Sequence, residues 1–194
     1  RIFDVVEKDC GQYDTVTEVM WVTGAALFIR LADYREVGGL DDHFFAHMEE
    51  IDLCWRLRSR GKKLVCIPQS VVYHVGGATL KKENPRKTFL NFRNNLLMLY
   101  KNLPDKELEH VLFIRGILDR VAALVFYLKK DRANARAVMQ ARREFEDIRY
   151  SFAASRIENI MKSTDEMIPE RTHFSILMKY YLLGKKHFSQ LKLF

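Results

Sequence analysis

The sequence is poor in cysteine, and its three cysteines do not form a recognisable set. Cys10, Cys54 and Cys66 include no CxxC pair. An odd number at this spacing argues against a disulfide framework and against a structural zinc site, and it favours a reducing, cytoplasmic compartment. Cys54 and Cys66 lie in apolar strings, so we expect both in the core.

Long hydrophobic runs and a targeting segment are also absent. No run reaches the roughly 18 apolar residues of a membrane span, and residues 121–128 are too short to cross. The chain begins at Arg1, and its first residues carry no targeting pattern. We therefore expect a piece of a longer protein.

Charge of one sign is not concentrated in any block. The net charge is +7, and acids are interspersed with the bases, although most of the surplus falls in residues 105–194. A basic surface can meet nucleic acid, anionic lipid or the phosphates of a small substrate. The interspersed acids make nucleic acid the least favoured partner, and steep salt dependence of binding would be its signature.

Apolar periodicity divides the chain into an α/β part, residues 1–104, and a helical part, residues 105–194. The boundary is placed at Leu103-Pro104-Asp105. Strands are predicted at 15–29, 63–68 and 70–75, and helices at 31–37, 49–60, 85–102, 106–130, 132–162 and 174–192.

Three carboxylates, Glu49, Glu50 and Asp52, begin the helix predicted at 49–60. Asp52 has Arg56 four residues on, which is a sufficient structural reason for that pair. Glu50 has no such partner and turns toward the apolar side of the helix. Acids at a helix start gain about 0.3–1 kcal/mol from the dipole. Alternatively, a carboxylate whose pKa is raised by burial is a general base, worth about 10²–10⁴ in rate.

A histidine and a set of cations lie near a glycine-containing loop. His74 ends an apolar strand, and Lys81, Lys82 and Arg86 follow within twelve residues. Glycines let the backbone approach a phosphate, and cations neutralise it. A lone histidine of this kind is more often structural, and it cannot hold a metal without other ligands.

Four segments together resemble a known family. WVTGAALFIR, GGLDDHFFAHMEEIDLCWRLRSRG, CIPQSVVYHVGG and FRNNLLMLYKN resemble, in order, the C-terminal half of a family 2 glycosyltransferase of the bacterial rhamnosyltransferase-like kind. The resemblance covers about residues 15–104. It implies a partial GT-A (nucleotide-diphospho-sugar transferase) fold in residues 1–104, forming the acceptor side of the catalytic domain, and a helical extension in residues 105–194.

The resemblance also implies roles for residues. The family's Glu-Asp-x-Asp motif falls on 49–52, so its base falls on Glu50, a glutamate where the family has aspartate. Glu49 and Asp52 stay alternative catalytic residues. Gly24 matches a family glycine after a strand. Asp41 and Asp42 match its acidic pair, for acceptor contact or scaffolding.

The donor side of the site is expected to be incomplete. His74 matches a position that contacts a metal or the diphosphate, and Lys81, Lys82 and Arg86 would assist with the donor. The family binds Mg²⁺ or Mn²⁺ mainly through an Asp-x-Asp motif in its N-terminal half, and no such motif is found here. We therefore expect this chain to be inactive alone.

The implied reaction is an inverting transfer from a nucleotide-diphospho-sugar to a saccharide or lipid-linked acceptor, in surface polysaccharide or glycoconjugate synthesis. Residues 174–194 read as an interfacial helix, which favours peripheral membrane contact or packing within an oligomer. The alternative is a non-catalytic membrane-docking or assembly module. Donor, acceptor and oligomeric state stay open.

Overall fold

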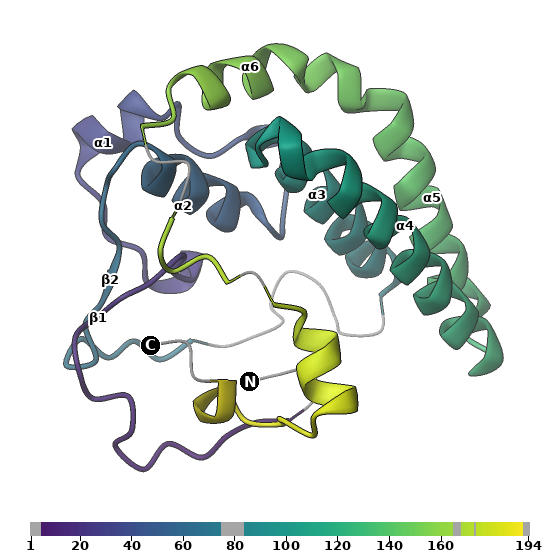
Figure 1. The fold of residues 1–194 in the computed structure, drawn as a ribbon, viewed down its shortest axis with the longest axis horizontal. Helices are drawn as coiled ribbons and strands as arrows, with labels where there is room; N and C mark the ends of the chain where they lie inside the picture. Colours follow the sequence, from purple (N-terminus) through teal and green to yellow (C-terminus); the bar gives the residue numbers. More distant parts are fainter. Residues whose placement is uncertain (1–4, 75–83, 165–167, 173, 192–194) are drawn as a thin grey trace.

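The computed structural model describes residues 5–74, 84–164, 168–172 and 174–191. The chain is mostly helical, with one small antiparallel sheet (Figure 1). The α-helices of the described residues are α1 (Leu31–Glu36), α2 (Glu49–Ser59), α3 (Pro85–Asn102), α4 (Asp105–Leu128), α5 (Arg132–Ile148) and α6 (Ala153–Met161). Short helical turns are η1 (Gly24–Ala26), η2 (Asp42–Phe44), η3 (Arg149–Phe152), η4 (Met178–Leu182) and η5 (Phe188–Leu191).

The start of α3 and the end of α2 agree with the capping residues that the sequence predicted. Asn84 caps α3 by accepting a hydrogen bond from the Arg86 N–H at 2.9 Å, with Pro85 at the first helical position. Gly61, with φ of 73°, follows α2 as predicted. The helix predicted at 132–162 is interrupted by η3, so α5 and α6 run in different directions (Figure 1).

The predicted strands are much shorter than expected. β1 (Thr17–Glu18) pairs with β2 (Val65–Cys66), with Thr17 opposite Cys66 and Glu18 opposite Val65. Among the described residues neither strand has a second neighbour. A two-stranded ribbon cannot cover its own apolar side chains, so the expectation that Cys66 is buried is wrong, whereas Cys54 is buried as predicted.

The C-terminal prediction is also wrong in part. Residues 174–191 do not form one helix; they form the single π-turn η4 and the 3₁₀ turn η5. Gly184, with φ of 65°, separates the two turns in a conformation that a continuous helix does not allow. Over residues 174–191, the expected interfacial helix is therefore replaced by two short turns with several exposed apolar side chains, and the rest of the predicted segment lies outside the described residues.

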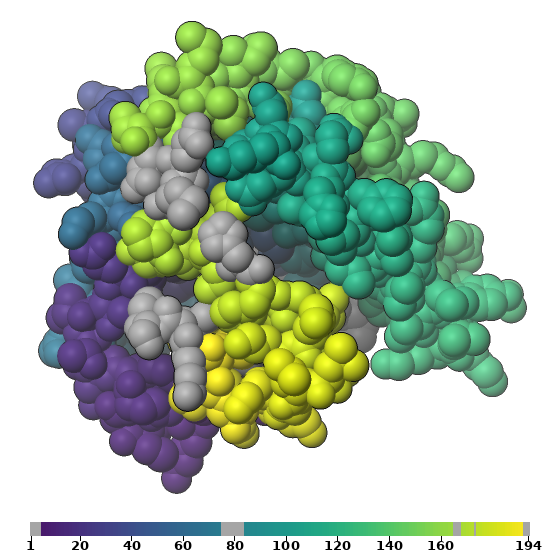
Figure 2. All heavy atoms as spheres, in the orientation of Figure 1, coloured from purple at the N-terminus to yellow at the C-terminus, as the bar shows by residue number. Residues whose placement is uncertain are grey.

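Helix α3 lies at the centre of the fold and contacts α2, α4, α5 and α6. The main hydrophobic core joins α2, α3, α4, η3 and the end of α5. Trp55 of α2 belongs to this core. The core contains side chains from both sides of residue 104, and α4 lies at the molecular surface in teal (Figure 2).

Candidate functional site

The loop that leads into α2 has an unusual backbone. Phe45, His47 and Met48 have φ values of 60°, 70° and 73°. Residues other than glycine rarely adopt this left-handed region, and each one costs about 1–3 kcal/mol and persists only where its surroundings impose it. Something outside the loop must therefore hold it in place.

That support comes from Asn94 of α3. Its side-chain Nδ2 lies 2.8 Å from each of the carbonyl oxygens of Phe44, Ala46 and His47. An amide has two N–H groups, so one of them is shared between two carbonyls. The neighbouring Arg93 donates to the His43 carbonyl at 2.8 Å. Helix α3 thus fixes the loop, and the loop sets the direction of the first turn of α2.

Three polar atoms of this first turn are buried without partners among the described residues. They are His47 Nε2, Glu49 Oε2 and Glu50 Oε2. Buried polar groups are nearly always hydrogen-bonded in proteins. A bound substrate could supply the hydrogen bonds that these two carboxylate oxygens and the histidine nitrogen lack.

Glu50 lies against the turn that contains Gly24. A Cβ placed on Gly24 would lie 3.7 Å from the Glu50 Cβ, so the η1 backbone borders the candidate base. Burial raises the pKa of Glu50 above the ordinary value, backbone N–H groups of Glu50 and Ile51 partly offset this rise, and the charge of Glu49 adds to it. Burial and the charge of Lys87 lower the pKa of His47.

Asp52 lies apart from this cluster, in a fully buried ionic network. Its Oδ2 accepts from Arg56 Nη2 at 2.8 Å and from Lys101 Nζ at 3.0 Å, and its Oδ1 accepts from Asn102 at 2.7 Å. The predicted pairing with Arg56 is confirmed. Because both oxygens are occupied, Asp52 is held as a structural residue.

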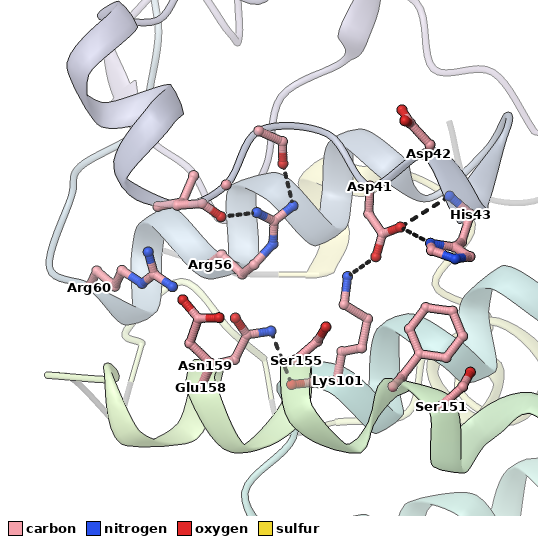
Figure 3. A pocket seen from close by; sticks show the side chains of 14 residues that line it. Asp41, Asp42, His43, Arg56, Arg60, Lys101, Ser151, Ser155, Glu158 and Asn159 are labelled. Carbon is pink, nitrogen blue, oxygen red and sulfur yellow. Dashed lines mark hydrogen bonds and ion pairs between the residues drawn. The ribbon is translucent and has the colours of Figure 1, made fainter.

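Asp41 and Asp42 line a polar pocket of about 460 Å³ between the 37–43 loop, α2 and α6 (Figure 3). Asp41 accepts from Lys101 Nζ at 2.7 Å and contacts His43 Nδ1 at 2.8 Å. In Figure 3, Lys101 points to Asp41, whereas the exposed Asp42 has no dashed contact. The pocket also contains Ser151, Ser155, Glu158 and Asn159.

The remaining predicted site residues are scattered. His74 is exposed, Arg86 lies 5.3 Å from the Phe45 ring centre, and Lys81 and Lys82 lie outside the described residues. Within the part of the chain that the structure describes, no three His, Cys, Asp or Glu side chains gather as a metal site. The structure therefore brings Gly24, Glu49 and Glu50 together and places Asp41 and Asp42 in a separate pocket.

Sequence reasoning missed Asn94 and Lys101, although a signal was present. Asn94 and Lys101 stand three and four residues from Leu97, on the face of α3 that also holds Leu90, and all four are buried. A polar residue inside an apolar helical stripe needs a partner. Its presence could have predicted the contacts to the loop and to Asp52, but not their identity.

Replacing Glu50 with glutamine should stabilise the fold at neutral pH. The folded-state pKa is raised, so ionising Glu50 costs stability as pH rises through the unfolded and then the folded value. We expect a gain of about 1 kcal/mol or less at pH 7, because the side chain is only half-buried, and none near pH 4. Urea unfolding at both pH values measures this.

Glu158 supplies a control of opposite sign. A hydrogen bond from Lys162 lowers the pKa of Glu158, so Glu158→Gln should lose a little stability at neutral pH. A Glu50→Gln variant that is less stable than the wild type at neutral pH would show that the carboxylate is paired in solution.

The chain is similar to parts of three named enzymes. It is 31% identical over 141 residues to a pre-mycofactocin glycosyltransferase of Mycobacterium tuberculosis, covering 67% of this chain and 29% of that protein. An N-acetylglucosaminyl-diphospho-decaprenol L-rhamnosyltransferase of M. tuberculosis is 38% identical over 56 residues, covering 29% and 18%. The Escherichia coli rhamnosyltransferase WbbL is 33% identical over 69 residues, covering 36% and 25%.

These similarities define how far the relationship extends. The matched part is less than a third of each relative's length. No family model and no solved structure matches the chain. All three relatives are named for the transfer of a sugar, so over this part of their length the chain is related to the glycosyltransferases.

Proposed function

We propose that this chain is the acceptor-side part of a family 2-like, GT-A type glycosyltransferase. The enzyme transfers a sugar from a nucleotide-diphospho-sugar to an acceptor hydroxyl, with inversion, in the synthesis of a surface polysaccharide or glycoconjugate. The observation that carries the proposal is the half-buried Glu50 carboxylate, which is bordered by Gly24 and whose Oε2 has no partner among the described residues. The names of the relatives support sugar transfer as the reaction class.

Glu50 acts as the general base in this proposal. One of its oxygens takes the proton of the acceptor hydroxyl while the hydroxyl oxygen attacks the anomeric carbon of the donor sugar. The bond from that carbon to the diphosphate breaks, and its electron pair leaves with the nucleoside diphosphate. A raised pKa suits this task, because it brings the proton affinity of the carboxylate closer to the working pH.

The strained loop contributes by positioning. Asn94 fixes the 44–47 backbone, so the first turn of α2 holds Glu50 in one place before substrate arrives. Small displacements of a reacting group are costly, about a hundredfold in rate for 1 Å. Asn94 is thus a positioning residue that acts through Glu50.

The pocket beside Asp42 is assigned to the acceptor. The Asp42 carboxylate, the hydroxyls of Ser151 and Ser155 and the Asn159 amide line this pocket, and they are groups that can form hydrogen bonds with saccharide hydroxyls. Arg86, with Lys81 and Lys82, is assigned to the donor diphosphate, and His74 to the same group or to a metal. No three His, Cys, Asp or Glu side chains of the described residues gather as a metal site.

We also propose that the enzyme uses a divalent cation, Mg²⁺ or Mn²⁺, as its cofactor. Its main ligands would come from outside the described residues. We place the enzyme in the cytoplasm, peripherally at the inner face of the membrane. None of the described helices is both long and apolar enough to cross a bilayer.

The test follows nucleoside diphosphate release by the full-length protein from a panel of nucleotide-sugars, with a membrane extract as acceptor. Glu50→Gln should lower release at least about a hundredfold, because removing a general base has that effect. Glu49→Gln is the matched control, an adjacent carboxylate of the same length. Chelation of divalent cations in the wild type tests the cofactor.

Each result has a distinct meaning. Loss in Glu49→Gln with full activity in Glu50→Gln would move the base to Glu49. Release that neither variant changes would remove the acidic cluster from the chemistry. A folded full-length protein that releases nothing from any donor would favour the docking module instead.

A further inference from the structure

Helix α4 carries an exposed apolar stripe on the side away from the core. With about 100° per residue, its members fall within an arc of about 120° that contains no charge between residues 113 and 128. Each is at least 40% exposed. The α4 stripe consists of Phe113, Ile114, Ile117, Val121, Leu124, Val125 and Leu128.

The opposite side of α4 is already packed against the protein. Leu108, Leu112 and Ala123 are buried. The buried Asp119 pairs with Arg142 of α5 at 2.8 Å, which fastens the two helices together. The stripe is therefore not needed to hold α4 in place. A helix that is apolar on both sides is normally covered on both.

A basic groove adjoins the stripe. It has a volume of about 870 Å³ between α4 and α5, and Leu124 belongs to both groove and stripe. Arg132, Arg136 and Arg143 of α5 line it. None of these three arginines has a carboxylate partner among the described residues. Arg136 Nε donates to the Arg132 carbonyl at 3.3 Å, and Arg132 lies over the Tyr127 ring, so the positive charge of all three guanidinium groups is uncompensated by a described carboxylate. Such groups beside an apolar surface are suited to anionic groups that are attached to apolar chains.

The charge around the α4 stripe helps to decide whether a second copy of the protein or an anionic surface covers it. Residues 113–143 hold eight basic and two acidic residues, a surplus of six. Both acids are engaged: Asp119 with arginines, and Asp131 as the cap of α5 on Asn134. A second copy of this face would bring two such basic surfaces together, which is unfavourable. An anionic surface is complementary to it.

We propose that the α4–α5 hairpin docks on an anionic lipid bilayer. The α4 stripe enters the boundary between headgroups and acyl chains, and the arginines of the groove contact lipid phosphates. Figure 2 shows α4 at the surface of one face of the molecule, with no other element over it. The docking is independent of the transferase reaction, and it would bring a lipid-linked acceptor to the enzyme.

Co-sedimentation with vesicles tests the docking without any donor or acceptor. The full-length protein should bind vesicles of equal parts phosphatidylcholine and phosphatidylglycerol. The double variant Ile117→Glu, Val121→Glu should bind at least about tenfold more weakly, because two inserted side chains become charged. Arg136→Gln with Arg143→Gln should weaken binding by about tenfold or more, and the loss should disappear on pure phosphatidylcholine.

Met161→Glu is the matched control, since Met161 is 80% exposed on α6, outside the hairpin. Its vesicle binding should equal that of the wild type. Wild-type binding that all variants retain, or no wild-type binding at all, would overturn the proposal. If the wild-type protein is a dimer that does not bind vesicles, and the stripe variant is a monomer, α4 is a subunit interface. Vesicle binding is measured without donor or acceptor, so neither of its outcomes decides whether Glu50 is the general base.

Discussion

Replacing Asp52 with alanine is expected to destabilise the protein by about 3–5 kcal/mol, the cost of removing one partner from a buried ion pair. Asp52 is fully buried, and its carboxylate is shared by Arg56, Lys101 and Asn102. Without it, the Arg56 guanidinium donates only to backbone carbonyls among the described residues, and Lys101 keeps the Asp41 carboxylate and its contact with the Phe44 ring. Urea unfolding of the purified variant measures the loss.

The matched control breaks another pair of the same spacing at the surface. Glu158 and Lys162 are also four residues apart, but both side chains are 55% exposed. Glu158→Ala should cost about 0.5 kcal/mol or less. Equal losses in the two variants would mean that water reaches the Asp52 network in solution, and a neutral Asp52→Ala would remove its assigned structural role.

Replacing Asn94 with aspartate should cost about 3 kcal/mol or more and should also impair catalysis. The change keeps the size of the side chain but removes both N–H donors, so an oxygen faces the carbonyls of Phe44, Ala46 and His47. The left-handed loop then loses its support, and Glu50 moves with it. We expect nucleoside diphosphate release to fall about a hundredfold.

Asn91→Asp is the comparison within the same helix. Asn91 donates a single hydrogen bond, to the Lys87 carbonyl at 2.8 Å, and makes no described contact to the loop. Its replacement should cost about 1 kcal/mol and leave release unchanged. If Asn94→Asp lost stability but kept full release, the loop would not position the base.

The sequence was most informative where neighbours along the chain decide the structure. The helix at 85–102, its Asn84-Pro85 start and the Asp52–Arg56 pair all depend on residues at most a few positions apart. The sequence also predicted that no cation stands one turn beyond Glu50, and Glu50 Oε2 has no hydrogen-bond partner among the described residues. These local predictions agree with the structure because residues three or four positions apart are neighbours in the helices α2 and α3.

Prediction failed where distant partners decide. The apolar character of 63–68 predicts a strand, but a strand needs neighbours, and only Val65 and Cys66 find one in the described residues. The contacts of Asn94 reach residues about fifty positions away, and no local rule identifies which carbonyls they meet. The position of the candidate carboxylates in the first turn of α2 was thus predictable, whereas the contacts of Asn94 with the preceding loop were not.

The clamp on the loop before α2 has a consequence for engineering. The 44–48 segment does not determine its own conformation; it is imposed by a side chain from α3. Moving residues 44–52 alone into a homologous scaffold should therefore transfer the carboxylates without the contacts that orient them. The smallest exchangeable module is discontinuous, and it joins the start of α2 to the middle of α3.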